Sequence, residues 1–411
     1  MTDNNIKIAF IGGLFPKEIR KNIMSNTIGQ PQNAADLLQW NLIEGLEKNI
    51  NSPITIINSL FIGSFPQRYK KLFINPQIFN HSSNEKHKDY NIGFINLPFV
   101  KQISRTKSIK RFLDKYSRIR QMDLAIGYSM TLPIVMGLKE IKKINPSIKT
   151  CLVVPDLPEY MNLSKDKGIL YNAIKKYNNK LLYEAIQDID CFVVLTKYMA
   201  DALEINDKPF AVIEGMTKAR DNIVEYNDSV KKFVYTGSLG SKYGILDLVD
   251  AFHRLDEENV ELVICGGGET TDYIKGIAAI DSRIKYKGVL TPEEVYKIQQ
   301  DAYILVNPRN SKEIYTKYSF PSKTLEYLAS GHPVLMYHLP GIPEDYDDYI
   351  LYIDETKDSL YQGLKKSISM DSKIIKDKGI LGKQFVENNK TSDIQTKKIL
   401  DMYDSLCKVG R

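Results

Sequence analysis

Residues 317–335, KYSFPSKTLEYLASGHPVL, combine a short helical pattern with side chains suited to binding a phosphorylated ligand. Apolar residues at spacings of three and four predict a helix, which Gly331 and Pro333 would end before a strand. The unpaired N–H groups at the start of such a helix favour a phosphate, and Lys323 would lie in the same turn. Glu326 would repel a phosphate, but its carboxylate can accept two hydrogen bonds from the vicinal hydroxyls of a ribose. A simpler role for Glu326 in stabilising the helix dipole, worth about 0.3–1 kcal/mol, stays open.

A second candidate phosphate site lies in YTGSLGSKYGILDL, where glycines follow an apolar run and open a helical pattern. Backbone amides near Gly237, Gly240 and Gly244, with the ammonium of Lys242, would suit a diphosphate. The alternative is a tight strand–helix turn that needs glycine only for its conformation. The glycine runs of the chain do not form the G-x-G-x-x-G pattern of nicotinamide-binding folds, and no P-loop lysine motif is present.

Acidic residues suggest a place for a second substrate. In VVPDLPEYM, Asp156 and Glu159 follow an apolar run, and a carboxylate there would orient or deprotonate an acceptor hydroxyl. A turn-forming role for Asp156 before Leu-Pro is an equally open alternative. Glu214 follows the last apolar run of the first half, whereas Asp188 and Asp190 precede a run and indicate a surface turn. None of the five histidines has metal-ligand spacing, so we predict no metal site.

Short apolar runs alternate with helical patterns along the whole chain, which is typical of parallel sheets covered on both faces. We predict an α/β fold with two doubly wound, Rossmann-like parallel-sheet domains that face a cleft. The predicted N-terminal domain is 1–216, the linker 217–231 and the C-terminal domain 232–385, and a terminal helix, 386–411, would pack back on the N-terminal domain. The predicted strands are 6–13, 54–62, 92–98, 123–129, 150–155, 191–196 and 210–215 in the first series, and 232–239, 261–268, 284–290, 302–308, 333–337 and 349–354 in the second.

Ligands of open parallel sheets bind at the carboxyl ends of the strands, so the residues just after each predicted strand are further candidates. On the acceptor side, in the first domain, they are Gly12, Gly13, Tyr128, Asp156, Glu159 and Glu214. In the second domain they include Gly237, Ser238, Lys242, Gly267, Val289, Leu290 and Arg309.

Composition describes an ordinary globular protein of 411 residues, 43% apolar and 26% charged, without an apolar run of about 18 residues or a signal-peptide pattern. The four cysteines are far apart and indicate buried thiols in a reducing compartment, so we expect a cytoplasmic protein. The net charge of +6 is local, because residues 101–120 carry eight Lys or Arg against Asp114 alone. A basic amphipathic segment of this kind is typical of binding to anionic lipids, here at the inner face of the membrane. The alternative is an ordinary helix whose charged face is solvated. We expect no nucleic-acid partner.

The second half resembles the donor-binding domain of retaining family-4 glycosyltransferases with the GT-B fold. The similar segments are FVYTGSLGSKYGILDLVDAF, LVICGGGE, RIKYKGVLTPEEVYKIQQDAYILVNPR and YSFPSKTLEYLASGHPVL, which cover roughly 232–340. The resemblance implies that Glu326 binds the ribose of a nucleotide sugar and that Val289 and Leu290 frame the base. It implies that Gly237, Ser238 and Lys242 meet the diphosphate, while Gly267, Arg309 and Tyr318 complete the donor site. The loop before the helix, comprising Ser319, Phe320, Pro321, Ser322 and Lys323, would contact the sugar and phosphates.

The chain departs from the family pattern at several catalytic positions. The family has a second glutamate eight positions before the ribose-binding one, where this chain has Tyr318. The family's arginine after the first-turn glycine is Ser238 here, and its lysine position holds Tyr243, beside Lys242. The common histidine of the first domain corresponds to Asp156. A subset of polysaccharide-building members has a similar YSFPSK-x-x-EYLASG form.

The sequence therefore predicts a hexosyltransferase-type glycosyltransferase of the capsule or cell-surface polysaccharide type. It would move a sugar from a nucleotide-sugar co-substrate to a glycan or lipid-linked acceptor, with retention, without a metal and without another cofactor. Asp156, Lys242 and Lys323 are the predicted catalytic residues. A non-catalytic GT-B partner or glycan-binding subunit and a GT-B-like sugar-nucleotide epimerase are the alternatives.

Overall fold

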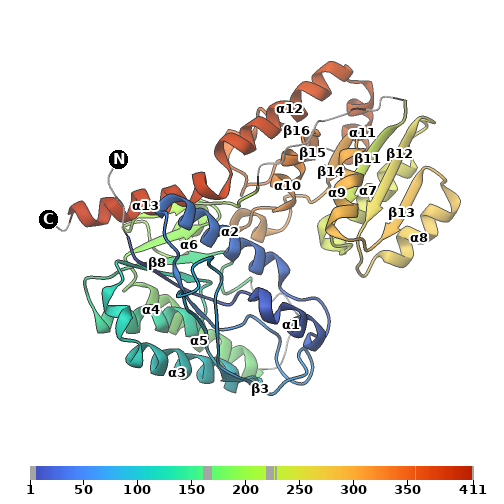
Figure 1. The fold of residues 1–411 in the computed structure, drawn as a ribbon. Coiled ribbons are helices and arrows are strands. Elements are labelled where there is room, and N and C mark those ends of the chain that lie inside the picture. Colours follow the sequence, from blue (N-terminus) through green and yellow to red (C-terminus); the bar gives the residue numbers. More distant parts are fainter. Residues whose placement is uncertain (1–5, 161–168, 219–225, 227–228, 357, 410–411) are drawn as a thin grey trace. The chain divides into compact units, whose positions relative to one another are not determined.

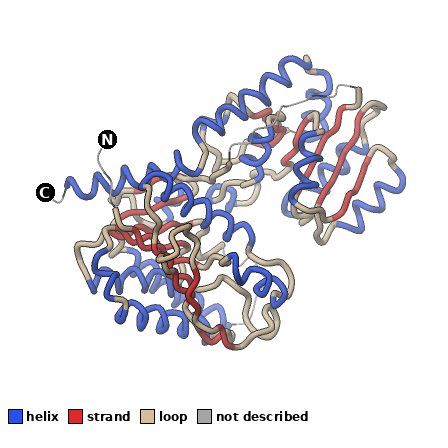
Figure 2. Tube along the Cα trace, in the orientation of Figure 1, coloured by secondary structure: helices blue, strands red, loops and turns tan. Residues whose placement is uncertain are grey.

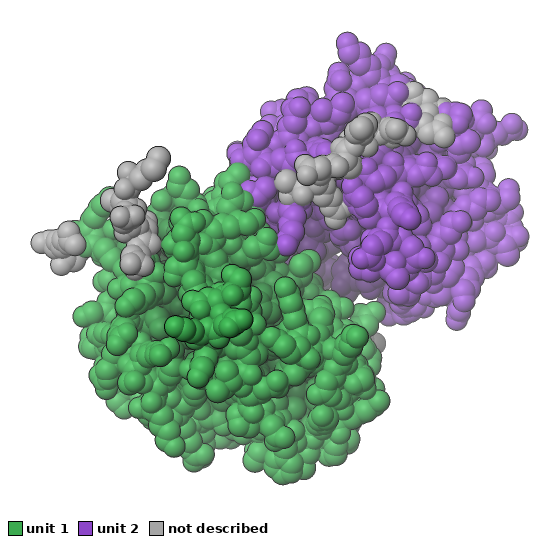
Figure 3. Space-filling view, viewed as in Figure 1, with its two compact units in different colours: residues 1–214, 392–411 green, residues 215–391 purple. Residues whose placement is uncertain are grey.

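The computed structural model describes residues 6–160, 169–218, 226, 229–356 and 358–409, which form two compact units. Unit 1 contains Met1–Glu214 and Ser392–Arg411, and unit 2 contains Gly215–Thr391 (Figures 1 and 3). Most of the predicted linker, 217–231, lies outside the described residues. Each unit has a wholly or mainly parallel sheet with helices packed against it (Figure 2), so the predicted α/β class with Rossmann-like sheets is confirmed.

The sheet of unit 1 has the strand order β10-β9-β8-β7-β1-β2-β5-β4. All neighbouring strands are parallel except β4 and β5, which pair antiparallel at one edge. The central strand β1 is buried along its whole length, as its unbroken apolar sequence predicts for a strand covered on both faces. The strands of unit 1 are β1 (Ile8–Gly12), β2 (Thr55–Asn58), β3 (Phe73–Ile74), β4 (Gln77–Phe79), β5 (Asp89–Asn91), β6 (Phe94–Ile95), β7 (Leu124–Tyr128), β8 (Lys149–Val154), β9 (Cys191–Val194) and β10 (Phe210–Val212).

Two predicted strands of unit 1 are wrong in extent. The predicted strand 54–62 ends at Asn58, because the chain after β2 turns and hydrogen-bonds to the loop after β1: Ser59 N–H to the Gly12 oxygen and Phe61 N–H to the Gly13 oxygen. The predicted strand 92–98 is reduced to β6, which pairs antiparallel with β3 outside the main sheet. Strands β3, β4 and β5 lie outside the predicted strands, because two- and three-residue strands have no periodicity of their own.

The basic segment 101–120 forms α3 (Val100–Lys115), followed by a turn of 3₁₀ helix, η2 (Ser117–Gln121). Its apolar face is buried: Ile109, Leu113 and Ile119 have at most 1% exposure. Phe112 and Tyr116 stack on each other with ring centroids 5.2 Å apart. The apolar face of this amphipathic helix therefore packs in the core of unit 1 and is unavailable to a lipid surface.

The other helices of unit 1 cover both faces of its sheet. They are η1 (Lys17–Ile19), α1 (Arg20–Asn26), α2 (Asn33–Ile50), α4 (Leu132–Ile144), α5 (Ile169–Ile186), α6 (Tyr198–Ala202) and α13 (Ser392–Val409). No described helix is both long enough and apolar enough to cross a bilayer.

The predicted single terminal helix, 386–411, is two helices in the structure. Helix α12 (Ser372–Asn389) belongs to unit 2, and α13 begins at Ser392 in unit 1. Helix α13 packs closely on α2: the Asn49 side-chain amide donates to the Asp393 oxygen at 2.8 Å, and a Cβ at Gly45 would lie 2.3 Å from the Ser392 oxygen. The C-terminal helix thus returns to unit 1 as part of its fold.

The sheet of unit 2 is fully parallel, in the order β13-β12-β11-β14-β15-β16. The chain runs outward from β11 to β13 and then crosses back to β14 on the other side of β11. The order therefore reverses between β11 and β14, the point at which open α/β sheets usually bind ligands. The strands are β11 (Lys231–Thr236), β12 (Val260–Cys265), β13 (Ile284–Gly288), β14 (Ile304–Asn307), β15 (Val334–Tyr337) and β16 (Ile350–Ile353).

Helices pack against this sheet around a large hydrophobic core. They are η3 (Ser241–Tyr243), α7 (Ile245–His253), α8 (Thr271–Ile280), α9 (Pro292–Gln300), η4 (Ile314–Tyr318), α10 (Lys323–Ser330), η5 (Glu344–Tyr346), α11 (Ser359–Ser369) and α12. Helix α10 ends at Gly331, whose φ of 87° lies in the left-handed region that favours glycine. The helix predicted within 317–335 therefore forms with the expected stop signal.

Candidate functional site

Three glycine-containing loops pack together at the carboxyl ends of β11, β12 and β13. Gly237 N–H donates to the Cys265 oxygen at 2.9 Å, and Gly266 N–H donates to the Gly288 oxygen at 2.7 Å. A Cβ at Gly266 would lie 1.8 Å from the Gly237 oxygen. Glycine is therefore required at position 266, where one backbone approaches another, so the structural alternative for the glycine turn has support.

The start of α10 lies beside the same glycine turn. The Cε atom of Lys323 is 3.6 Å from the position that a Cβ would take at Gly237. The side chain of Ser322, the N-cap residue, forms no capping hydrogen bond and so does not compete with an anion at the helix start, although the Thr324 N–H donates to the Pro321 oxygen at 2.8 Å. The structure thus brings together two predicted phosphate-site residues that are 86 residues apart in sequence, Gly237 and Lys323.

Glu326 is held between a cation and an amide. Its Oε2 atom lies 3.1 Å from Lys323 Nζ, and its Oε1 atom accepts a hydrogen bond of 2.8 Å from Gln299 Nε2. Gln299 is fully buried and also donates to the Thr236 hydroxyl at 3.0 Å, which ties it to the end of β11. About one third of the Glu326 side chain is exposed, so the carboxylate is oriented by the protein and still accessible.

Gln299 is a site residue that the sequence analysis missed. It lies near the end of α9, away from the capping box at Thr291 that begins this helix. Its role depends on α9 and α10 packing side by side, which only the folded chain creates. Tyr327 reinforces the arrangement, because its hydroxyl accepts from the Thr236 N–H at 2.9 Å.

Arg309 lies in the loop after β14 and contacts the segment that leads to α10. Its Nη2 atom donates to the Ser319 hydroxyl at 2.9 Å, and its guanidinium carbon is 4.7 Å from the centre of the Tyr315 ring. Arg309 is only 8% exposed. Arg309, which was predicted to bind the donor, is therefore buried and contacts the Tyr315–Ser319 segment in this structure.

The other predicted donor residues differ in exposure and form an exposed, a half-buried and a buried group. Ser238, Lys242, Val289 and Ser322 are exposed; Gly237, Gly267, Leu290, Tyr318 and Ser319 are half-buried; Phe320 and Pro321 are buried. The Lys242 ammonium lies 5.1 Å from the centre of the neighbouring Tyr243 ring, and the Phe320 ring packs 5.5 Å from Tyr346. Phe320 and Pro321 therefore contribute to the core, whereas Lys242 and Val289 present their side chains to solvent.

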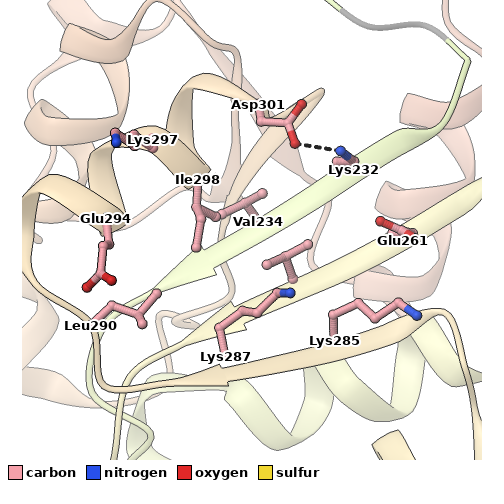
Figure 4. A pocket seen from close by; sticks show the side chains of 11 residues that line it. Lys232, Val234, Glu261, Lys285, Lys287, Leu290, Glu294, Lys297, Ile298 and Asp301 are labelled. Carbon is pink, nitrogen blue, oxygen red and sulfur yellow. Dashed lines mark hydrogen bonds and ion pairs between the residues drawn. The ribbon is translucent and has the colours of Figure 1, made fainter.

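A groove of about 520 Å³ opens on one face of β11, β12 and β13 beside α9 (Figure 4). Its walls carry both charges, and Lys232 is paired with Asp301. Leu290 is the one predicted donor residue that lines this groove, so the groove and the turn at Gly237 and Lys323 are different places. The lining residues are Lys232, Val234, Glu261, Val263, Lys285, Lys287, Leu290, Glu294, Lys297, Ile298 and Asp301.

In unit 1, Asp156 lies just after β8, and Tyr128 is the last residue of β7. These two strands are neighbours in the sheet. Burial raises the pKa of Asp156 to about 6, although part of its side chain reaches solvent. Burial, and then the charge of Asp156, raise the pKa of Tyr128 above its usual value. The charge of Asp156 thus acts on Tyr128, and a pKa of about 6 lies closer to neutral pH than that of an ordinary aspartate.

The remaining acceptor-side candidates have structural partners. Glu159 accepts hydrogen bonds from the Tyr183 hydroxyl at 3.1 Å and the Asn179 amide at 3.4 Å, so it is tied to α5. Gly13 is covered by the Phe61 ring, since a Cβ there would lie 1.8 Å from Phe61, and a Cβ at Gly12 would lie 2.4 Å from the Gln39 side-chain oxygen. Glu214 is 4% exposed. Of the acceptor-side predictions, Asp156 has the geometry and electrostatics best suited to chemistry.

Comparison with known proteins gives matches of different extent. Residues 230–369 match the family model described as glycosyl transferases group 1. An uncharacterized glycosyltransferase of Methanocaldococcus jannaschii is 26% identical over 121 residues, which are 28% of this chain and 30% of that protein. The chain therefore spans less than a third of this curated relative.

Solved structures match nearly the whole chain at low identity. A sucrose-phosphate synthase from Thermosynechococcus elongatus has a TM-score of 0.64 and 12% identity, covering 98% of this chain and 100% of that one. The lipopolysaccharide outer core galactosyltransferase WaaB has the same TM-score and coverage at 16% identity. HepE of Anabaena, solved in complex with UDP, has a TM-score of 0.60 and 11% identity over 97% of this chain and 100% of that one. The chain thus has the GT-B fold, and its residues 230–369 are similar to glycosyl transferases of group 1.

Proposed function

We propose that this chain is a glycosyltransferase that takes a sugar from a nucleotide-sugar donor bound by unit 2. The observation that carries the proposal is the meeting of the Gly237 turn with the start of α10, where Lys323 and Glu326 lie side by side. This arrangement supplies an ammonium and helix amides for a diphosphate, and an oriented carboxylate for a ribose. The match of residues 230–369 to glycosyl transferases of group 1, and the UDP bound to HepE, support the same assignment.

In the proposed reaction, the bond between the sugar and the diphosphate breaks and negative charge develops on the departing diphosphate. Lys323, Lys242 and the first-turn amides of α10 would stabilise that charge, the role that a metal ion plays in other transferases. Asp156 of unit 1 would orient or deprotonate the hydroxyl of a glycan or lipid-linked acceptor. We propose a retaining hexosyl transfer in cell-surface polysaccharide synthesis, in keeping with the sequence resemblance.

Thermal unfolding in the presence of nucleoside diphosphates and their sugars tests the donor site. A ligand that binds the native state stabilises it, by about 2.7 kcal/mol at 100 times its dissociation constant. We expect one base to raise the melting temperature, and the matching nucleotide sugar to be consumed when lipid-linked or polysaccharide acceptors are added. No stabilisation by any common nucleoside diphosphate would contradict the proposal.

Tyr318 keeps a second candidate open, because it stands where the resembling family has its second glutamate. A non-catalytic GT-B subunit would bind donor or glycan and show no Glu326-dependent donor hydrolysis. A sugar-nucleotide epimerase would convert a donor to its epimer without any acceptor. Incubating the protein with donor alone and separating the products distinguishes both from a transferase.

The activity should depend on pH through Asp156. Only the carboxylate form can accept a proton, so kcat/KM should rise by about tenfold per pH unit below the Asp156 pKa, and level off above it. The midpoint should lie near the folded-state pKa of about 6. The change of Asp156 to Asn should remove this limb of the pH profile. The change of Asp188 to Asn should keep it, because Asp188 is an exposed carboxylate paired with Lys139 at 2.6 Å. A profile with the same limb in both variants would exclude Asp156 as the base.

The proposed contact with the inner face of the membrane needs a surface other than the buried face of α3. Exposed apolar residues gather beside the start of this helix: Phe73, Ile95, Phe99, Val100 and Ile103. Phe73 and Ile95 pair across β3 and β6, and the Ile95 N–H donates to the Ser104 hydroxyl at 2.9 Å. Lys107 and Arg111, exposed on the same helix, supply positive charge for anionic lipids. We propose that this apolar patch docks on the membrane.

Replacing Phe99 and Ile103 together with serine should weaken binding to anionic liposomes by at least about tenfold. Each apolar side chain that leaves water contributes about 1.5–3 kcal/mol, and 1.4 kcal/mol corresponds to about tenfold in affinity. The control is Ile280→Ser, which removes an exposed apolar side chain from α8 of unit 2. Sedimentation with liposomes measures the effect, and equal binding by wild type and the double variant would exclude the patch.

A further inference from the structure

Four side chains with metal-ligand chemistry converge at one edge of the unit 1 sheet. His81 and His87 lie in the loop between β4 and β5, and Asp89 is the first residue of β5. The His81 Nδ1 atom is 2.6 Å from Asp89 Oδ2, and the His87 Nε2 atom is 3.0 Å from Asp89 Oδ1. Glu47, on α2, places its Oε1 atom 2.8 Å from His81 Nε2. One ligand atom from each of His81, His87 and Asp89 lies within 4.8 Å of the other two.

The cluster is well enclosed. The side chains of His81, His87 and Asp89 are 7%, 10% and 0% exposed, respectively. The Asp89 carboxylate is oriented by two backbone groups: Oδ1 accepts from the Ile56 N–H at 2.9 Å, and Oδ2 accepts from the His81 N–H at 3.1 Å. Buried and pre-oriented nitrogen and oxygen ligands of this kind suit a transition metal better than Ca²⁺ or Mg²⁺, which prefer oxygen alone.

We propose that His81, His87 and Asp89 bind a zinc ion, with Glu47 as a positioning residue. Two imidazoles and one carboxylate are common zinc ligands, and a fourth position would be taken by water. The hydrogen bond from His81 Nε2 to Glu47 reproduces the carboxylate–histidine–metal arrangement, which orients a ring and raises its basicity. Because metal–ligand bonds of about 2.0–2.2 Å place ligand atoms somewhat over 3 Å apart, shifts of about 1 Å would complete the site.

The His81 ring is held in place without a metal as well, because its Nδ1 and Nε2 atoms are hydrogen-bonded to Asp89 and Glu47. In either state the cluster joins the β4–β5 loop to α2, and a metal would make that link stronger. The proposal concerns unit 1 alone and does not depend on the proposed transferase activity.

Titration of tag-free full-length protein with Zn²⁺, in competition with a chromophoric chelator, tests the site. We expect one zinc ion per chain and a tetrahedral visible spectrum when Co²⁺ is used in its place. The His87→Gln variant should lose this binding and this spectrum, and the Glu47→Gln variant should bind about 10- to 100-fold more weakly. The control is His338→Ala, which removes a half-exposed histidine of unit 2 outside the cluster.

Hydrogen exchange supplies a readout that adventitious binding would not affect. Zinc should slow the exchange of backbone amides in β4 and β5 of wild type and of His338→Ala, and should have no such effect in His87→Gln. Comparison of the far-UV circular dichroism of the variants checks that each is folded. Absence of stoichiometric zinc binding to wild type, or binding that survives in His87→Gln, would overturn the proposal.

Discussion

Replacing Glu326 with glutamine should weaken the binding of a nucleoside diphosphate by about 10- to 150-fold. A hydrogen bond to a charged group contributes about 1.5–3 kcal/mol, and 1.4 kcal/mol corresponds to about tenfold in affinity. Glutamine has nearly the same shape, but it loses the charge that strengthens bonds from the ribose hydroxyls and the ion pair with Lys323. Calorimetric titration measures the effect with the base that binds wild type, and the same loss should appear in kcat/KM.

The chain offers a closely matched control for this variant. Glu387 on α12 is 29% exposed and lies 3.8 Å from Lys383, whereas Glu326 is 32% exposed and lies 3.1 Å from Lys323. The change of Glu387 to glutamine removes a similar helical ion pair, of small stabilising effect, from a different part of unit 2. Equal affinities of the two variants would show that Glu326 has only a helix-stabilising role and would remove the main support for the ribose contact.

Introducing a methyl group at Gly266 should destabilise unit 2 by at least about 2 kcal/mol. A Cβ there would lie 1.8 Å from the Gly237 oxygen, so the turn after β11 must move away. Overpacking typically costs about 1–3 kcal/mol. The φ of 144° at Gly266 adds strain of about 1–3 kcal/mol for a residue other than glycine. Because the displaced turn lies beside Lys323, the Gly266→Ala variant should also lose affinity for the donor.

Urea unfolding followed by far-UV circular dichroism measures this effect. Fluorescence would not report it, because the single tryptophan of the chain, Trp40, lies in unit 1. The control is Gly276→Ala in α8, where a Cβ would meet nothing within 4 Å. That change should be neutral or stabilise unit 2 by about 0.4–1 kcal/mol, since alanine favours the helix. A Gly266→Ala protein as stable as wild type would mean that the three loops pack less tightly than the structure indicates.

The predicted donor residues illustrate what can be read from sequence around a site. The rule that ligands gather at the carboxyl ends of parallel strands selected Gly237, and the helix-start pattern of 317–335 selected Lys323 and Glu326. The structure brings these three residues together. It also shows that Arg309 and Phe320 are buried and contact other parts of the protein. Burial of these two side chains depends on which loops pack over them, and that information is absent from the local pattern.

The basic segment 101–120 also shows that a local pattern predicts a helix but not what packs against it. Its periodicity correctly predicted an amphipathic helix, because side chains three and four residues apart share one face of a helix. Periodicity does not say what covers that face. In the structure the apolar face of α3 packs within unit 1, and the exposed apolar patch lies at the start of α3 and on β3 and β6.

Local sequence patterns were enough to predict the α/β class, the two series of strands and the stop of α10 at Gly331, and they also marked the Gly237 and Lys323 segments as candidate phosphate sites. These features follow from interactions between residues close together in the chain, which hydrophobic periodicity and helix-end signals record. Only the tertiary structure decided that Gln299 holds Glu326 and that Glu47 joins His81, His87 and Asp89. The physical reason is that such contacts form between side chains whose elements meet only when the sheets assemble, and no local pattern encodes which elements those are.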